Sequence, residues 1–424
     1  MNHPNSSLPS PLTRSRQLLF VCVFASMAGL NLYTLWQART LVARGHSDFM
    51  HFYVAGRMTR TGQGSQLFDA NRQLAAQQSL SEPVRTRGKP VIYMHPPFEA
   101  LLFAPFSYLP YIDAYLLWNL LSILALMAVP LLLRSELSTF HGIPAWSWII
   151  FLLAFFPVFA VLLQGQDDAL FVLLLTLAYL ALRRKADLRA GSWLGLALFR
   201  PQFALPLMFI LLFGGQWSAV AGFALTGLGL ATLTVVVFGW PQLWGYPRHL
   251  WSSEQAVNPG GVLLGHMPNL HGLLAGTLSH QVAPSAILAL VLLLSAVLLI
   301  FAAEKWRRCR HNFPDLAFSL AVVAAILVSY HAFAQDLSLL LLPTLLQGNW
   351  MLTRKPRPIT GWLMLLPMLI LFINPLCYSM VRHRCFNLFT LALLAWFVAS
   401  VASITDQTRR SAAFADTPRP LPAF

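Results

Sequence analysis

A succession of apolar runs, separated by short polar and basic segments, dominates this chain. The runs cover residues 18–35, 111–133, 144–163, 168–182, 191–213, 218–239, 284–303, 314–331, 335–347, 359–380 and 386–403. Several approach the roughly 20 residues that a helix needs to cross a bilayer. Only 10% of the residues are charged, whereas soluble domains carry about 25%. The sequence therefore predicts an all-α polytopic membrane protein.

The basic residues indicate how the chain is oriented. A net charge of +14 could indicate nucleic-acid binding. The Lys and Arg residues instead form short clusters between apolar runs, which is typical of cytoplasmic loops beside an anionic leaflet. We therefore expect membrane lipids, and no nucleic acid, as partners. No cleavage site follows the first run, which predicts an uncleaved span preceded by a cytoplasmic tail.

The run at 191–213 decides the predicted topology. As one helix it would place two later basic clusters, at 307–310 and 354–357, outside the cell, against the positive-inside tendency. Pro201 lacks a backbone donor and disfavours helix at Arg200, so a break there has a physical cause. Two half-helices return both clusters to the cytoplasm. The charge of Arg200 must then face protein or a wet cavity.

With this break, the sequence predicts a bundle of about twelve membrane segments with both termini in the cytoplasm. The predicted parts are a tail at 1–16, a transmembrane domain at 17–403 and a flexible cytoplasmic tail at 404–424. Two long outer loops are expected, at 39–97 with amphipathic helices and at 240–283. Prolines interrupt the segment 98–109, which predicts an interfacial or re-entrant helix.

In this topology the unusual polar residues gather at the outer interface. Asp48 follows the first span, and Arg200 and Gln202 lie at the vertex of the broken helix. The other members of this set are Gln166, Asp168, His51, Tyr53, His95, His331 and Asp336. An ionisable group within or beside a membrane segment indicates a functional site by default.

This set of residues suits transfer of a group from a lipid-linked donor. A lipid phosphate is a good leaving group, so the main requirement is a base for the acceptor hydroxyl, and one positioned carboxylate can serve. Asp48 is the candidate base. Arg200 suits a bidentate grip on the departing phosphate, and His331 could donate to it as well. A single base opposite the leaving group implies inversion at the anomeric carbon.

Five segments carry a resemblance to a known family. They are "SDFMHFYVAGRMTRTGQGSQLFD", "YMHPPFEALLFAPFSYLP", "QGQDDALFVLLLTLA", "AGSWLGLALFRPQ" and "YHAFAQDLSLLLLP". In this order they resemble glycosyltransferase family 87 over residues 17–350. The members of that family are integral-membrane transferases of the GT-C type that use polyprenyl-phosphate sugars, often polyprenyl-phosphate mannose.

The resemblance implies an inverting transferase that moves a sugar, with mannose first among the candidates, from a polyprenyl-phosphate donor to a glycolipid or glycan acceptor. It implies a multi-pass protein of the bacterial plasma membrane whose active site faces outward. Asp48 would be the catalytic base, and Arg200, Gln202 and His331 would bind the donor phosphate. We expect further substrate contacts from Gln166, Asp168, His51, Tyr53, His95 and Asp336.

This chain departs from the family pattern in two places. A more usual GQxN element appears as Gly165-Gln166-Asp167-Asp168, which adds negative charge near an anionic donor. Arg200 replaces the commoner Lys, which keeps the charge but changes its geometry.

Most of these residues also have a simpler structural interpretation. Asp48 could cap the helix that follows it, and Gln166 or Asp168 could cap the next span. Arg200 could pair with an acid such as Asp168 and stabilise the helix break. His331 could be a helix-end histidine whose hydrogen bonds are satisfied.

No cofactor is indicated, and no metal site is assigned. His46, Asp48 and His51 could hold a metal, but three ligands on one short segment are a weak signal. The four cysteines lack metal-site spacing. Acids from different segments are the other candidate ligands for a divalent cation, and they are Asp48, Asp167, Asp168 and Asp336.

Two other functions stay open. Discontinuous helices and buried charge also suit a transporter or flippase of a lipid-linked or anionic substrate. A transporter should carry polar residues through both halves of the membrane, whereas here they crowd toward one face. A non-catalytic relative that only binds lipid-linked sugars is the third alternative, and the altered element at 165–168 is compatible with it.

Overall fold

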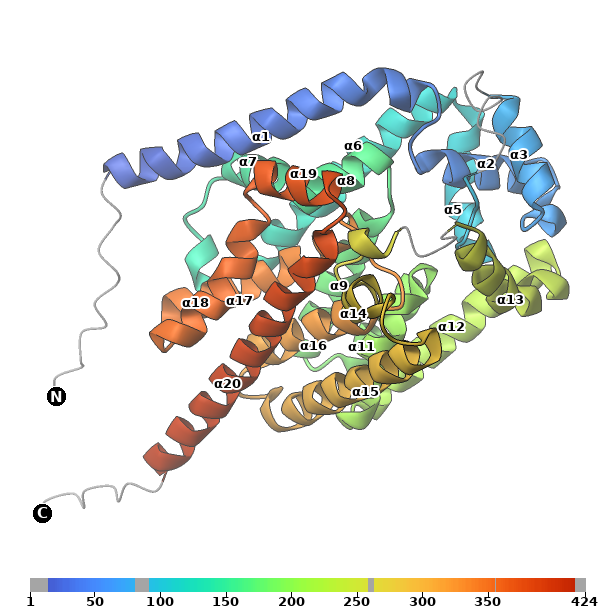
Figure 1. The fold of residues 1–424 in the computed structure, drawn as a ribbon. Coiled ribbons are helices and arrows are strands. Elements are labelled where there is room, and N and C mark those ends of the chain that lie inside the picture. Colours follow the sequence, from blue (N-terminus) through green and yellow to red (C-terminus); the bar gives the residue numbers. More distant parts are fainter. Residues whose placement is uncertain (1–13, 81–90, 258–262, 355, 416–424) are drawn as a thin grey trace, which may run out of the picture.

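The computed structural model describes residues 14–80, 91–257, 263–354 and 356–415. Within these ranges the chain forms helices and no strand, so the predicted all-α class is confirmed (Figure 1). Four helical segments are long and apolar enough to cross a membrane, or six if each of two bent helix pairs is one span. The four are α6 (Tyr111–Leu133), α12 (Trp217–Phe238), α15 (Pro284–Cys309) and Phe386–Arg410, which includes most of α20 (Phe389–Ala415). The expected total of about twelve segments is not confirmed.

Two apolar runs that the sequence predicts as continuous spans are bent. The pairs are α7 (Ala145–Ala154) with α8 (Phe156–Gln164) at 77°, and α18 (Pro358–Ile370) with α19 (Asn374–Arg382) at 71°. The second helix of each pair has a proline in its first turn, where a fixed φ and a missing N–H favour a new helix start. The Phe156 N–H donates to the Leu371 carbonyl over 2.9 Å, so the two bends lie side by side.

The predicted break at Arg200 is confirmed. α10 (Asp187–Leu196) continues into a 3-10 turn at Ala197–Phe199, and α11 (Pro201–Phe213) starts anew. Arg200 stands between them with φ −118° and ψ 70°, outside the helical region. Pro201 occupies the first position of α11, where its missing N–H costs nothing.

Close packing of α10 on α12 fixes the approach to this break. A Cβ added to Gly191 would lie 1.7 Å from the Ala219 carbonyl oxygen, and one added to Gly222 would lie 2.0 Å from the Leu188 carbonyl oxygen. Only glycine fits at these two crossings, as at many helix contacts in membranes. The half-helix that leads to Arg200 is therefore held against a long apolar helix.

The region predicted as the first outer loop forms its own group of short helices at one end of the molecule (Figure 1). It follows α1 (Arg14–Ala43) and contains α2 (Phe49–Arg60) and α3 (Ala70–Gln78). The segment predicted as one interfacial helix at 98–109 is instead divided into α5 (Ala100–Phe103) with 3-10 turns before and after it. The prolines at positions 97 and 105 each start one of these turns, which explains the division.

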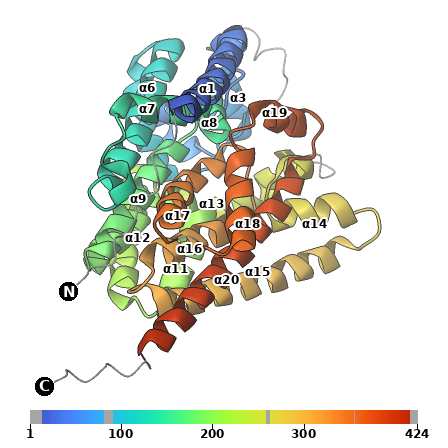
Figure 2. The ribbon, with the colours of Figure 1, turned by 90° about the vertical axis from the view of Figure 1, so that its left-hand side faces the viewer.

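The interior of the bundle is built by three helices. They are α9 (Asp168–Arg183), α16 (Pro314–Val328) and α17 (Leu341–Arg354), and α16 is buried along most of its length. Figure 2 shows α16 and α17 between α9 and α20. α20 continues to Ala415, past residue 403, where the sequence predicted the transmembrane domain to end. The remaining helices are α13 (Trp240–Val257) and α14 (Leu270–Leu278).

Candidate active site

A polar cavity of about 230 Å³ lies where the region predicted as the first outer loop, the helix break at Arg200 and the loop after α16 meet. Most of the site residues predicted from the sequence line it, namely Asp48, His51, His95, Gln166, Arg200, Gln202, His331 and Asp336. Tyr246 and Leu250 of α13 form part of its wall. The structure thus brings together residues that are up to 288 positions apart, from position 48 to position 336.

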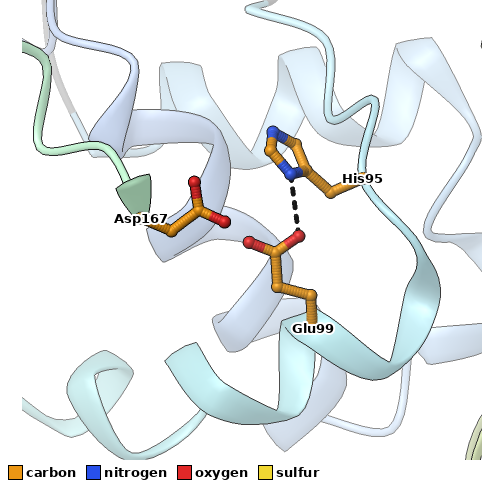
Figure 3. Close-up of side chains that lie close together, drawn as sticks. All are labelled: His95, Glu99 and Asp167. Carbon is orange, nitrogen blue, oxygen red and sulfur yellow. Dashed lines mark ion pairs between the residues drawn. The ribbon is translucent and has the colours of Figure 1, made fainter. Parts of the chain in front are cut away.

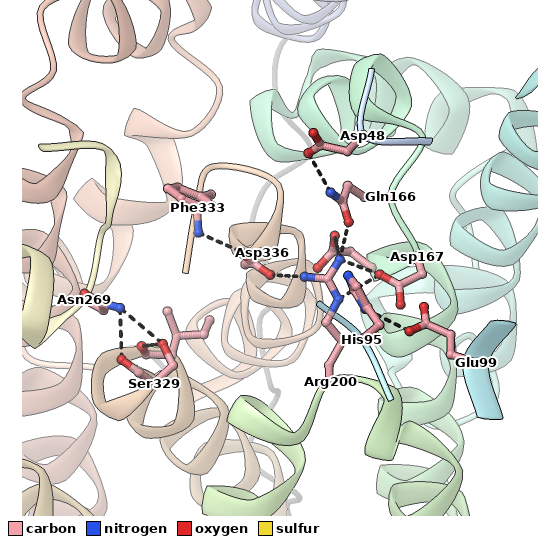
Figure 4. Close-up of polar contacts among 12 residues, drawn as sticks. Asp48, His95, Glu99, Gln166, Asp167, Arg200, Asn269, Ser329, Phe333 and Asp336 are labelled. Carbon is pink, nitrogen blue, oxygen red and sulfur yellow. Dashed lines mark hydrogen bonds and ion pairs between the residues drawn. The ribbon is translucent and has the colours of Figure 1, made fainter. Parts of the chain in front are cut away.

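Arg200 is the centre of a buried charge network (Figure 4). Its Nε donates to Asp167 Oδ1 over 2.7 Å, and its Nη1 donates to Asp336 Oδ1 over 2.7 Å. Its Nη2 contacts Asp168 Oδ2 at 3.0 Å. The arginine side chain is 5% exposed and all three acids are buried, so the four groups depend on one another for charge compensation. The ion pair with Asp168, proposed as the simpler interpretation of Arg200, is present as one of three.

Gln166 connects this network to Asp48. Its Oε1 accepts from Arg200 Nη2 over 2.5 Å, and its Nε2 donates to Asp48 Oδ2 over 2.8 Å. The Asp48 N–H in turn donates to Gln164 Oε1 over 3.2 Å. The Asp48 side chain does not accept a capping hydrogen bond from α2, and Gln166 lies before the first turn of α9. Among the described residues, therefore, neither Asp48 nor Gln166 caps a helix, which was the simpler interpretation of both.

Gly165 makes this turn possible. It ends α8 in the left-handed region at φ +63°. A Cβ at this position would lie 2.7 Å from the Cβ of Phe49. A glycine here lets the chain reverse and brings Gln164 and Gln166, on either side of it, to the backbone and the carboxylate of Asp48.

A second fixed loop carries Asp336 and His331. Asp336 Oδ2 accepts from the Phe333 N–H over 2.6 Å, which folds the segment back on itself. Asn269 is fully buried and caps α14 by accepting from the Gly272 N–H over 2.7 Å. Its Nδ2 donates to the Ser329 carbonyl over 2.9 Å, so the chain just before α14 holds the start of this loop (Figure 4).

His95, Glu99 and Asp167 form a compact group (Figure 3) that lies on one side of Arg200 (Figure 4). His95 Nδ1 lies 2.8 Å from Glu99 Oε2. Burial raises the pKa of the Glu99 carboxyl well above its usual range, and Asp167 adds to the effect. Burial lowers the pKa of His95 to about 3. Both shifts favour the neutral forms, so this contact is not a strong ion pair.

Glu99 is the site residue that the sequence analysis missed. It lies four residues after His95, and prolines at positions 96 and 97 start the 3-10 turn that carries it. A histidine and an acid at this spacing share one face of a helical turn, which was the available signal. The carboxylate of Asp167 comes from another segment, so only the tertiary structure completes the group.

One expectation is corrected. Tyr53 does not line the cavity, since its hydroxyl donates to the Leu109 carbonyl over 2.8 Å and its ring packs in the aromatic core between α2 and α6. The trio of His46, Asp48 and His51 does not assemble as a metal site among the described residues.

A second cavity, of about 430 Å³, meets the first at Asp48, Phe333 and Gln335. Its other walls are mainly apolar and include Phe159 and Leu163 of α8. Asp48 therefore stands between a polar cavity and an apolar one.

The helices that are long and apolar enough to cross a membrane, together with the buried charge network, indicate an integral-membrane protein with a polar site. The model of glycosyltransferase family 87 matches residues 93–329, more than half of the 424-residue chain. This chain belongs to glycosyltransferase family 87, as its motifs suggested, and it is a membrane glycosyltransferase. The matched region includes Gln166 and Arg200 but not Asp48. No curated protein and no solved structure matches the chain.

Proposed function

We propose that this protein transfers a sugar from a polyprenyl-phosphate donor to a hydroxyl of a glycolipid or glycan acceptor, with inversion at the anomeric carbon. The site would face the outside of the bacterial plasma membrane, and mannose is the first sugar to test. The observation that carries the proposal is the position of Asp48, which lines both cavities and is held by Gln166 at 2.8 Å.

In the proposed reaction Asp48 accepts the proton of the acceptor hydroxyl. The hydroxyl oxygen forms a bond to the anomeric carbon while the bond from that carbon to the phosphate oxygen breaks. The phosphate leaves with the bonding electron pair and needs little acid assistance. Gln166 holds one carboxylate oxygen of Asp48, which fixes the direction of the base relative to the sugar.

The polar cavity suits the sugar and phosphate of the donor. Gln202 and His331 lie on its wall and supply hydrogen-bond donors to phosphate oxygens. Arg200 also lines it, but its guanidinium already contacts three carboxylates. We therefore assign Arg200 a double role, as part of the phosphate-binding wall and as the residue that positions Gln166.

The apolar cavity suits the acceptor. Inversion requires the acceptor hydroxyl to attack the anomeric carbon from the face opposite the leaving group. With the donor in the polar cavity, a base that lines both cavities therefore has the acceptor on its other side, in the apolar cavity. A glycolipid acceptor presents apolar surface next to its hydroxyls, which matches walls formed by Phe159 and Leu163. The transporter alternative finds no support, since the polar groups form one enclosed network and the family is a transferase family.

The test is transfer of radiolabel from polyprenyl-phosphate mannose to pooled cell-envelope acceptors by the native protein and by Asp48→Asn. We expect activity to fall about 100- to 10,000-fold in the variant, the range typical of a lost general base. Asp187→Asn is the matched control, because it removes an acid at the start of α10, outside both cavities.

Equal transfer by Asp48→Asn and the native protein would remove Asp48 from the chemistry. If native protein transfers neither mannose nor arabinose from such donors, the proposed donor class is wrong.

A further inference from the structure

The acids around Arg200 outnumber the cation that pairs with them. Asp167, Asp168 and Asp336 contact its guanidinium, and Glu99 lies beside Asp167. Arg200 is the single arginine in these ion pairs among the residues that the structure describes. An excess of buried carboxyl groups must be relieved either by protons or by a further cation.

The carboxyl groups that are in excess lie on the side of the network away from Arg200. Glu99 is 2% exposed and Asp167 is fully buried. The Oδ2 of Asp167 and the Oε1 of Glu99 have no hydrogen-bond partner among the described residues, and the Oε2 of Glu99 has only its 2.8 Å contact with His95 Nδ1. Figure 3 shows these two carboxylates facing each other, with the His95 ring beside them. Two facing carboxylates either share a proton or hold a cation between them.

We propose that His95, Glu99 and Asp167 bind a divalent metal ion of the manganese or zinc class beside the polar cavity. One ligand atom from each side chain lies within 4.8 Å of the other two. Ligands about 2.1 Å from a metal are at most about 4.2 Å apart, so small side-chain rotations bring the three into range. An imidazole with two carboxylates suits Mn²⁺ or Zn²⁺ better than Mg²⁺, which prefers oxygen alone.

His51 is a second, independent indication at the same place. It is 6% exposed, and neither of its ring nitrogens has a hydrogen-bond partner within the described chain. Its ring stacks on that of His95, with centroids 5.4 Å apart and an interplanar angle of 24°. Buried imidazoles are normally hydrogen-bonded or bound to a metal, and metal ligands are commonly supported by neighbouring polar groups.

The role of this ion rests on the proposed function. His95 lines the polar cavity, so an ion bound to it lies next to the space assigned to the donor phosphate. Its two positive charges would offset the carboxylates around Arg200 and let an anionic donor enter a site that is otherwise negative. Binding of the ion itself does not depend on which sugar or acceptor is used.

The experiment measures Mn²⁺ binding by the full-length protein in detergent after removal of metals with EDTA. Free Mn²⁺ is followed by electron paramagnetic resonance during titration, and Zn²⁺ is added as competitor. We expect one ion per chain, with the affinity lowered about tenfold or more in Glu99→Gln and in His95→Ala. Glu136→Gln is the matched control, because Glu136 is an ion-paired acid outside this group and should leave binding unchanged.

Binding to the native protein can also be tested without any variant. Electron spin echo modulation of bound Mn²⁺ should show coupling to an imidazole nitrogen, so variants that fail to fold do not leave the question open. The proposal is overturned if the native protein binds neither Mn²⁺ nor Zn²⁺, if Glu99→Gln binds as well as native, or if nitrogen coupling is missing.

The outcomes also separate this inference from the proposed function. Full sugar transfer by metal-stripped protein would overturn the role of the ion in donor binding and leave the transferase function intact. A tightly bound ion with nitrogen coupling in a protein that transfers no sugar would support the metal site and contradict the proposed transferase function.

Discussion

Arg200 Nη1 lies 2.7 Å from Asp336 Oδ1, which joins two residues 136 positions apart in the chain. The first stands at the break between α10 and α11, and the second begins the turn that leads into α17. Because Gln166 bonds the same guanidinium, one arginine holds three separate chain segments around the cavity. The site is therefore a product of mutual charge compensation, and each member is sensitive to loss of another.

Replacing Arg200 should test this dependence. Arg200→Met leaves three buried carboxyl groups without their cation, and we expect a loss of about 3–5 kcal/mol in unfolding free energy. Arg200→Lys keeps the charge but cannot reach all partners, so it should fall between Met and native. Thermal unfolding in detergent measures both. Arg308→Met, which breaks an exposed pair with Glu304, should change stability by less than about 1 kcal/mol.

Gln166 and Gln164 form a matched pair around Asp48. Gln166→Glu replaces a donor to the Asp48 carboxylate by another acceptor, so the two carboxylates repel and the base is misoriented. We expect kcat to fall about tenfold or more. Gln164→Glu keeps an acceptor for the Asp48 N–H and should retain most activity. Similar kcat values for the two variants would contradict the proposed role of Gln166.

Gly165→Ala should destabilise the protein. Its φ of +63° is unfavourable for alanine, and the new Cβ would lie 2.7 Å from Phe49 Cβ. The backbone conformation alone costs about 1–2 kcal/mol, and the clash adds to it. Gly142→Ala serves as control, since a Cβ there meets nothing within 4 Å. The unfolding of the two variants is compared under the same conditions. An equal loss of stability in both would contradict this explanation.

Acid should destabilise the contact of α13 with the segment around Tyr93. Burial lowers the pKa of His249, whose Nε2 lies 2.8 Å from the Tyr93 carbonyl oxygen. The native protein therefore binds this proton less readily than the unfolded chain, whose histidine has a pKa of about 6.5. The contribution of neutral His249 to the free energy of unfolding is therefore fully present above about pH 6.5 and is lost as the pH falls below this value.

His249→Phe gives the comparison for this pH effect. It keeps the stacking on Phe68, whose ring centroid is 4.1 Å from that of His249, but removes the titrating group. Between pH 7 and about pH 5, its melting temperature should fall less than that of the native protein. A steeper or equal fall in the variant would show that His249 does not contribute.

Local chemistry explains what was predictable from the sequence. The apolar runs and the scarcity of charge determined an all-α membrane protein, because uninterrupted hydrophobicity depends on the chain alone. The break at Arg200 was predictable because Pro201 acts on its own neighbour. The same rule could have located the bends near Pro157 and Pro375, but each proline lies inside a long, mainly apolar run that by itself predicts one span.

The site was predictable as a set of residues but not as an arrangement. Asp48, Gln166 and Arg200 were singled out because polar groups beside membrane segments are rare, and they do line one cavity. The sequence by itself determined which groups are available and where helices must break. Only the tertiary structure decided that Asp167 turns one oxygen to Arg200 and faces Glu99 with the other side, and that Tyr53 belongs to the core. Ion pairing and burial depend on distances between segments far apart in the chain, which packing fixes and local sequence does not record.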